Sequence, residues 1–146
     1  MTIAEAYRRF SRLDLRGQVP IIFELTEEEL ILLNQAQLYT ESIDKDGDPL
    51  GGYQQIEYEE MKIEMNPQLG GRVDLYFSGA FYSGFYVEVL KDEYIIGSKD
   101  EKSELLSNKY GMAIFGLTDE SKARYTREIF FRALKNYIET TGFKMV

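Results

Sequence analysis

Three residue types are missing from this chain of 146 residues: it has no cysteine, no histidine and no tryptophan. Without cysteine there is no disulfide, no thiolate nucleophile, no zinc–thiolate site and no iron–sulfur cluster. Without histidine there is no Ser-His-Asp triad and no imidazole base. Any catalysis would therefore have to use carboxylates, lysine, tyrosine or serine.

Long apolar runs are also missing. No stretch approaches the roughly 18 consecutive apolar residues that predict a membrane span. The first ten residues carry charge where a signal peptide needs an apolar run. The glycine pairs do not form a phosphate-binding loop, because neither the GxxxxGK[ST] nor the GxGxxG pattern occurs. We therefore expect a soluble protein that is made in the cytoplasm, with no nucleotide, metal or other cofactor.

The net charge of −8 is concentrated in one internal segment. Residues 24–66 contain 12 acidic and 2 basic side chains, whereas residues 1–23 contain 4 basic and 2 acidic ones. A surface that binds duplex DNA needs lysine and arginine to neutralise phosphates, so the acidic segment should repel DNA. Either it is a solvated face with an acidic loop, or it meets a basic partner or lines a passage for DNA.

Helical signals lie at both ends of the chain. Apolar residues three and four apart predict a helix over residues 2–16, which Gly17 ends, and Pro20 predicts an extended link over residues 19–23. Thr26 and Glu29 fit a capping box, so a second helix should run from there to about residue 41. Thr118 should cap a long last helix that Gly142 ends. One apolar face of that helix should contain Ala123, Phe130, Ala133, Leu134, Tyr137 and Ile138.

The middle of the chain has strand signals. Two alternating runs predict a bulged strand over residues 56–65, with a helix as the alternative. A short helical turn within residues 76–86 should lead into strands over residues 85–90 and 93–98, joined by a hairpin turn at Lys91 and Asp92. Residues 99–110 form a loop or short helix, and residues 111–115 could be a third strand. Loops are predicted at residues 44–52 and 66–71.

These elements predict one α+β domain with a small, mainly antiparallel sheet packed by two or three helices. Its N-terminal helical part covers about residues 1–42, the sheet-containing part about residues 55–117 and the closing helix about residues 119–141. The order of helices and strands shows no internal repeat.

Two acidic patterns in the sequence resemble metal-binding sites. Residues 44–48, DKDGD, resemble a calcium loop, but an EF-hand needs glycine at the sixth position and glutamate at the twelfth, where this chain has Pro49 and Gln55. An exposed turn is the simpler interpretation. Asp48, Glu60 and Lys62 resemble the Asp…Glu-x-Lys set of magnesium-dependent nucleases, in which two carboxylates hold the metal. No basic DNA-binding surface lies near that set in the sequence.

The second half of the chain resembles a known family. Residues 72–83, RVDLYFSGAFYS, are similar to the DLxxTGxLxxS stretch of phage virion-morphogenesis and tail-completion proteins, with Ser78 in place of threonine. The strand pair YVEVL and YIIGS at residues 86–90 and 94–98 follows as in that family. Residues 109–111 (KYG) and 114–120 (IFGLTDE) are similar to its aromatic-Gly step and to the entry of its closing helix. The resemblance covers about residues 69–140.

The resemblance implies a structural role and no catalysis. Such a protein would be a neck or tail-completion component that joins the portal connector to the tail, assembles as a homo-oligomeric ring and lets DNA pass without binding it specifically. It would be made in the cytoplasm of the bacterial host and would end up in the virion. The residues that carry the family pattern, in shaping roles, are Asp74, Ser78, Gly79, Tyr110, Gly111, Phe115, Gly116, Leu117 and Thr118.

Other functions remain open at this stage. The chain could be a different head–tail connector or tail-terminator subunit, which would share this composition. It could also be the magnesium-dependent nuclease described above, or a phage-encoded inhibitor that presents its acidic face to a basic host protein. The six aromatic residues within 76–86 could form a stacking platform for single strands or sugars, or else a core or subunit interface.

Overall fold

Helices and one β-hairpin build the part of the chain that the computed structural model describes, residues 2–143. The α-helices are α1 (Ile3–Ser11), α2 (Leu15–Leu25), α3 (Glu27–Ala36), α4 (Ile56–Met65), α5 (Ala80–Ser83), α6 (Ser103–Tyr110), α7 (Asp119–Tyr125) and α8 (Phe131–Ile138). The strands are β1 (Phe85–Leu90) and β2 (Glu93–Ser98). This arrangement confirms the predicted α+β class with an antiparallel sheet and a long C-terminal helix.

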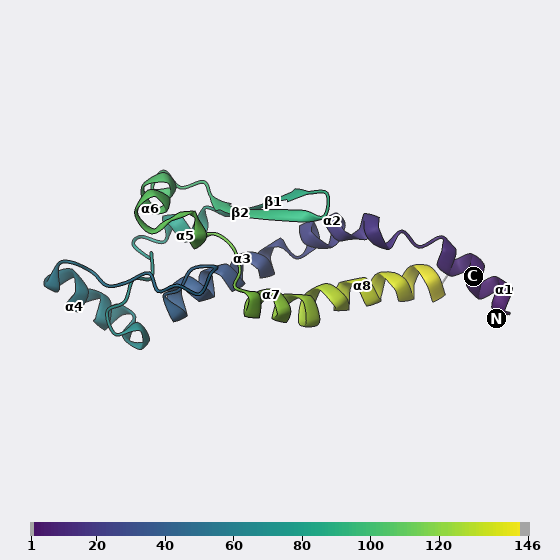
Figure 1. The fold of residues 1–146 in the computed structure, drawn as a ribbon, viewed down its shortest axis with the longest axis horizontal. Helices are drawn as coiled ribbons and strands as arrows, with labels where there is room; N and C mark the ends of the chain where they lie inside the picture. Colours follow the sequence, from purple (N-terminus) through teal and green to yellow (C-terminus); the bar gives the residue numbers. More distant parts are fainter. Residues whose placement is uncertain (1, 144–146) are drawn as a thin grey trace.

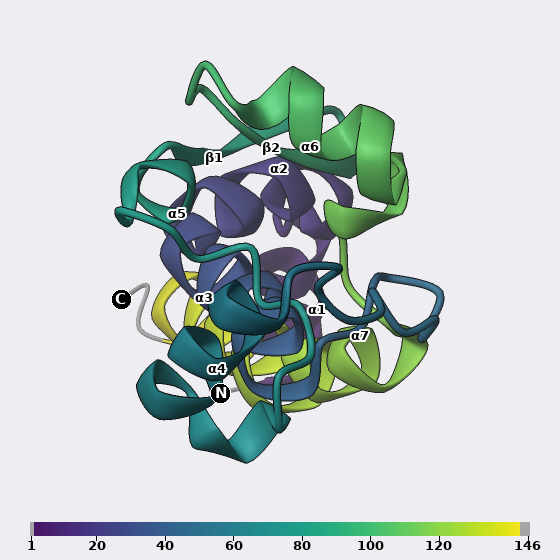
Figure 2. The same ribbon diagram turned by 90° about the vertical axis from the view of Figure 1, so that its left-hand side faces the viewer.

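Three layers are visible in the ribbon. The hairpin β1–β2 lies on one side of α2 and α3, and α7 and α8 lie on the other (Figures 1 and 2). The molecule is elongated: α4 lies at one end, and α1 lies at the opposite end together with the end of the C-terminal helix (Figure 1). No helix within residues 2–143 is both long enough and apolar enough to cross a membrane.

The predicted end of the first helix is wrong. Gly17 does not end it, and residues 19–23 are not an extended link, because all of them lie in α2. Asp14 caps α2, since its carboxylate accepts a hydrogen bond from the Gly17 N–H at 2.9 Å. Pro20 stands inside this helix, where it removes one backbone hydrogen bond. Burial of the neighbouring side chains Ile22 and Phe23 offsets that loss.

Thr26 does begin the next helix, but not through the predicted capping box. Its side chain forms no cap hydrogen bond to α3. Instead, the Thr26 hydroxyl donates to the carbonyl of Ile22 at 2.7 Å and shares a 2.6 Å hydrogen bond with the Tyr125 hydroxyl. The Thr26 side chain therefore bonds back to α2 and across to Tyr125 of the C-terminal helix. As predicted, helical structure continues to Glu41, with a π turn (Gln37–Glu41) at its end.

Residues 56–65 form helix α4, so the predicted bulged strand is wrong and the alternative was right. The apolar residues that suggested two faces of a strand, such as Met61 and Ile63, are exposed. The buried side chain of α4 is Lys62, which is 3% exposed. A hydrophobic pattern could not identify this helix, because its inward-facing residue is charged.

The hairpin matches the prediction residue by residue. Phe85 pairs with Ser98 at the open end and Leu90 with Glu93 at the turn, across Lys91 and Asp92. Lys91 adopts a φ of 49° and Asp92 has no positive φ, which is the pattern of a type II′ hairpin turn, with a positive φ at its first central position only. The third strand is wrong, because Met112–Ile114 is a single 3₁₀ turn. Within residues 2–143 the sheet therefore has two strands.

The last helix begins as predicted: Thr118 caps α7, and its hydroxyl accepts from the Ser121 N–H at 3.1 Å. Two π turns, Thr126–Phe130 and Glu139–Phe143, interrupt it, and it continues one residue beyond Gly142. A π turn adds one residue and shifts the face that follows. Ala123, predicted on the apolar face, is therefore exposed, whereas Tyr125 is buried.

The core lies where the three layers meet. It contains Phe23, Leu30, Leu38, Val73, Leu75, Phe81, Phe85, Ile96, Leu106, Ile114, Leu117 and Tyr125. Two of the aromatics in segment 76–86, Phe81 and Phe85, belong to it, and their ring centroids are 5.2 Å apart in an edge-to-face arrangement. These rings therefore help to hold the hairpin to the helices, which favours the core interpretation over an exposed stacking platform.

Candidate functional site

A buried ion pair is the first unusual feature of the molecule. Lys62 of α4 places its ammonium 2.7 Å from Oδ1 of Asp74, and the two side chains are 3% and 1% exposed. Asp74 also accepts hydrogen bonds from the side-chain amide of Asn66 at 3.0 Å and from the Tyr76 N–H at 2.9 Å. The pair ties α4 to the segment that precedes the hairpin. Asp74, predicted to shape this turn, is therefore its central polar residue.

Tyrosines surround this ion pair. Tyr82 donates its hydroxyl to the backbone carbonyl of Asp74, and Tyr53 contacts the Asp74 carboxylate at 3.4 Å. Burial raises the pKa of both tyrosines well above the usual value, and the nearby negative charge of Asp74 adds to the increase. Both hydroxyls therefore stay protonated and act as hydrogen-bond donors. The centre is a polar network in which the buried Asn66 Oδ1 lacks a hydrogen-bond partner among the described residues, and its tyrosines are not poised as acids or bases.

The remaining residues of the turn lie close by. Gly79 adopts a φ of 90° just before α5, in the left-handed region that favours glycine. The Ser78 hydroxyl is within 3.4 Å of the Ala80 N–H at the start of the same helix. Both are near the surface, and both direct the chain into α5 and then β1. Their positions are compatible with the shaping role that the resemblance implies.

A second polar cluster holds the segment that leads into the last helix. Asn34 of α3 donates to the Ile114 carbonyl at 2.9 Å and accepts from the Gly116 N–H at 2.8 Å. One turn later, Gln37 donates to the Gly116 carbonyl at 3.0 Å and accepts from the Thr118 N–H at 2.9 Å. We call these two side chains the amide clamp. The clamp forms hydrogen bonds with backbone N–H and C=O groups that a neighbouring β-strand would otherwise bind. This explains why no third strand forms here.

The sequence prediction missed the amide clamp as a unit. Its only signal was the presence of two amides three residues apart, Asn34 and Gln37, on the side of the predicted helix that also contains apolar residues. Both side chains are now seen to be fully buried, at 0% and 1% exposure. Amides at such positions can replace a neighbouring strand as hydrogen-bond partners of an irregular segment.

The other family-pattern residues lie along the clamped segment. Tyr110 ends α6 and is half-buried, and Gly111 follows with a φ of 93°. Phe115 packs against the Phe85 ring with centroids 5.7 Å apart, and Leu117 is 1% exposed. These residues anchor the segment between the hairpin and α7.

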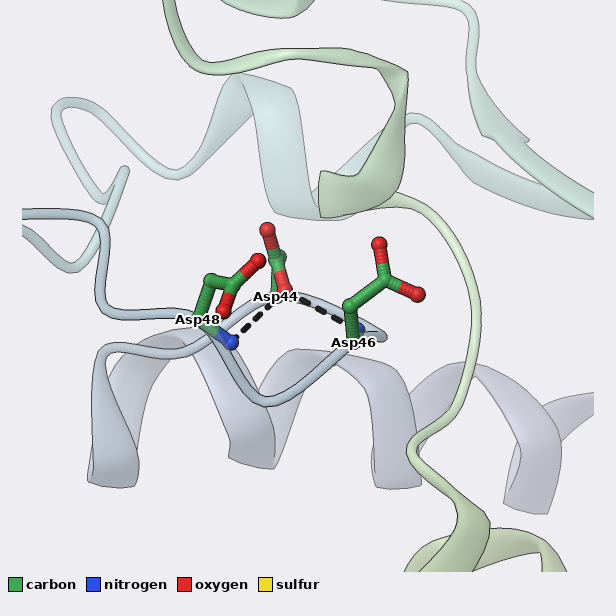
Figure 3. Close-up of side chains that lie close together, drawn as sticks. All are labelled: Asp44, Asp46 and Asp48. Carbon is green, nitrogen blue, oxygen red and sulfur yellow. Dashed lines mark hydrogen bonds between the residues drawn. The ribbon is translucent and has the colours of Figure 1, made fainter.

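The acidic loop is built around Asp44. Its carboxylate oxygen Oδ1 accepts the backbone N–H groups of Asp46 and Asp48 at 2.9 and 3.0 Å (Figure 3). Carboxylate oxygens of the three aspartates lie within 4.8 Å of one another. These hydrogen bonds account for the position of Asp44, which is buried at 8% exposure, whereas Asp46 and Asp48 are exposed. The loop is an aspartate-nucleated turn whose first carboxylate points inward, not the fully exposed turn that the sequence suggested.

The three residues of the nuclease hypothesis do not form one site. The Lys62 ammonium is occupied by Asp74 and by the Tyr76 carbonyl at 2.5 Å. Glu60 is exposed on the outside of α4, and Asp48 is exposed in the acidic loop. Because the lysine is held inside the molecule by a different aspartate, it cannot steady a hydroxide beside these two carboxylates.

A groove of about 650 Å³ lies between β2 and the α7 end of the last helix. Its floor and walls are mainly aromatic and aliphatic, from Phe23, Tyr94, Ile96, Phe115, Tyr125 and Phe130. Lys45 and Lys122 line it as well, and so do Asp92 and Glu93 of the hairpin. No pattern in the sequence indicated this groove, because its lining comes from five separated segments.

The end of the molecule that contains α1 has an uncovered apolar surface. None of the described side chains of α1 or α8 is buried. Ile3 is 90% exposed, Tyr7 74% and Phe131 53%. We call α1 together with α8 the arm. The Asp14 N–H donates to the Tyr137 hydroxyl at 3.2 Å, which joins the start of α2 to α8 within the arm.

Comparison with known protein families, with curated proteins and with solved structures found no match to this chain.

Proposed function

We propose that this chain is a structural assembly protein of a tailed phage or prophage, a neck or tail-completion subunit that joins the portal connector to the tail. The resemblance of residues 69–140 to tail-completion proteins supports the proposed location in the neck of the virion. The observation that carries the assembly role is the arm, on which Ile3, Tyr7 and Phe131 are left exposed to solvent by the rest of the described chain. The protein is made in the host cytoplasm and becomes part of the virion.

The arm has the features of a contact surface. Residues Ile3 and Tyr7 are four apart and lie on one side of α1, and contiguous exposed apolar surface of this kind marks interaction sites. Arginines frame it: Arg8 is exposed on α1, Arg12 is exposed directly after the end of α1, and Arg132 is exposed on α8. The arm is thus apolar along its centre and basic around it, which favours a partner surface that is apolar and acidic.

The opposite part of the same molecule offers such a surface. The first turn of α3 exposes Glu27, Glu28 and Glu29, with Leu25 74% and Leu32 56% exposed nearby in sequence. At the far end, α4 exposes Glu57, Glu60 and Glu64 beside Ile56 at 73% exposure. We call the exposed faces of α3 and α4 the acidic surface. The arm of one copy and the acidic surface of the next are complementary in charge.

A contact between two different surfaces of identical chains is head-to-tail, and it closes into a ring when the rotation between copies permits. The arm and α4 lie at opposite ends of the long axis (Figure 1), which prevents the arm of a copy from reaching its own α4. Acidic side chains that remain uncovered in such a ring would repel DNA and so ease its passage. The complementary surfaces support the proposal of a homo-oligomeric ring, and the proposed neighbours of that ring are portal and tail proteins.

The proposal is tested in the strain that encodes the chain. Purified particles should contain it at a few to a few tens of copies by peptide mass spectrometry. A strain lacking it should produce DNA-filled heads and separate tails by electron microscopy. The wild-type gene should restore joined particles, whereas Ile3→Asp with Tyr7→Asp should not, because charge on the arm opposes burial of its apolar stripe.

The matched control is Leu105→Asp, a change at a side chain that is 67% exposed on α6, away from the arm. It should restore particles as well as the wild type does. Absence of the chain from infectious particles, or unchanged particle assembly without it, contradicts the proposed function.

A further inference from the structure

One edge of the hairpin has backbone groups directed away from its partner strand. Leu90 and Glu93 flank a two-residue turn and therefore form a hydrogen-bonded pair. In an antiparallel ladder, hydrogen-bonded and non-hydrogen-bonded pairs alternate, so Tyr94 and Ile96 belong to the second kind. Their N–H and C=O groups point outward from β2. Within residues 2–143 the sheet has only β1 and β2, so no strand of the described chain covers this edge.

This edge borders the groove. Residues 92–96, which include most of the outward-facing part of β2, line one side of it, and Tyr125, Thr126 and Phe130 of the last helix line the other. The groove of about 650 Å³ has a mainly apolar lining. A free strand edge beside an apolar channel is the arrangement that binds extended peptides, because the edge supplies main-chain hydrogen bonds and the channel takes alternate side chains.

The charges in the groove are separated. Asp92 and Glu93 lie at the hairpin turn. Lys45 and Lys122 come from the other side: the Lys45 side chain lies against Gly116, and both lysines also line a second, adjoining hollow around Leu117 and Thr118. Neither lysine is in an ion pair with another described residue. The acidic side chains Asp46, Asp119 and Glu120 line the adjoining hollow but not the groove. A ligand carboxylate would therefore complement the two lysines on the side where they face the groove.

We propose that this groove binds an extended peptide segment of a partner protein, which adds to β2 as a third strand. The segment is about five residues long, since a strand advances about 3.3 Å per residue and five consecutive residues line the groove, one from the turn and four from β2. It has apolar side chains at alternate positions and a carboxylate, from an acidic residue or a chain end, over Lys45 and Lys122. The arm takes no part in this site, so the groove can bind whether or not the chain forms a ring.

The first test blocks the groove without touching the strand edge. The full chain is used to select from a display library of short random peptides, in parallel with the variants Thr126→Trp and Arg127→Trp. Thr126 is exposed and lines the groove, whereas Arg127 is exposed and does not line it. Selected peptides should show alternating apolar residues and an acidic end. Their affinity should fall by roughly tenfold or more in Thr126→Trp and stay unchanged in Arg127→Trp.

The second test exchanges the charge. With Lys45→Glu and Lys122→Glu together, selection should recover peptides that have a basic residue where the wild type selects an acidic one. Circular dichroism of each variant checks that it folds. Three results overturn the proposal. The first is that no peptide is enriched on the wild type relative to Thr126→Trp, and the second is that the selected peptides bind Thr126→Trp equally well. The third is that Thr126→Trp changes the oligomeric state, which would make a second copy of the chain the occupant of the groove.

Discussion

At the scale of single residues, the polar side chains inside the molecule decide its shape as much as the apolar ones. Lys62 and Asp74 are each almost fully buried and pair with each other. Burying two charges is costly, and their attraction compensates for this only when hydrogen bonds satisfy the remaining lone pairs and protons. Asn66 and the Tyr76 backbone supply such bonds, which makes the pair a specific junction between α4 and the hairpin segment.

The junction predicts a strong effect of removing one charge. Asp74→Asn should lower the free energy of unfolding by about 3–5 kcal/mol, because it leaves the Lys62 ammonium buried without a counter-charge. The double variant Asp74→Asn with Lys62→Met should be more stable than Asp74→Asn alone. Urea denaturation followed by circular dichroism measures all three proteins. A single variant as stable as the wild type would show that Lys62 does not depend on Asp74.

At the scale of elements, side chains of one helix fix the conformation of a distant segment. The amide clamp, with Asn34 on α3 and Gln37 in the π turn that continues it, makes four hydrogen bonds to residues 114–118, which are about 80 positions away in the sequence. These bonds hold the segment that leads Thr118 to the start of α7. The position of the last helix is therefore fixed by the amide clamp as well as by the Thr118 cap. Because α7 lines one side of the groove, the shape of the groove depends on the position of this helix.

Gln37→Leu tests the amide clamp. The leucine keeps much of the side-chain volume but leaves the Gly116 carbonyl and the Thr118 N–H without partners, which should cost about 1–3 kcal/mol of stability. Hydrogen exchange should show the amide of Thr118 losing protection first. Gln54→Leu, at an exposed position before α4, is the control and should change stability little. Equal stability of the two variants would contradict a structural role for the clamp.

At the scale of the whole molecule, charge and shape are both polarised. Residues 24–66 have a net charge of −10, while the arm at the opposite end has exposed arginines and uncovered apolar side chains. An elongated molecule whose two ends are complementary in charge can associate head to tail with further copies of itself.

This polarity predicts association that depends on salt. Sedimentation of the purified chain should show oligomers that weaken as ionic strength rises, because salt screens attraction between exposed charges over about 10 Å at 0.1 M. Arg8→Glu with Arg12→Glu should reduce association, and Glu57→Lys with Glu60→Lys should do the same. Mixing the two charge-reversed proteins should restore it. If association depends neither on salt concentration nor on either pair of charge reversals, the arm does not bind the acidic surface.

How much the sequence predicts differs between the parts of the molecule. The hairpin, the Thr118 cap, the loops and the helix that ends near Glu41 follow from local signals: period-two alternation, turn residues and a cap next to a helical pattern. The predictions that were wrong concern positions where contacts with residues distant in the sequence outweigh the local sequence signal. Pro20 indicated a break, yet burial of Ile22 and Phe23 keeps the helix intact, and the Thr26 hydroxyl bonds to Tyr125 instead of its own helix.

The sequence by itself determined the α+β class, the antiparallel hairpin, the long capped last helix and the separation of acidic from basic segments. Only the tertiary structure decided that residues 56–65 are a helix, that residues 111–115 are not a strand, and where the groove lies. The physical reason is common to these cases. They depend on partners for buried polar groups, Asp74 for Lys62 and the α3 amides for the 114–118 backbone, and such partners are far apart in the chain.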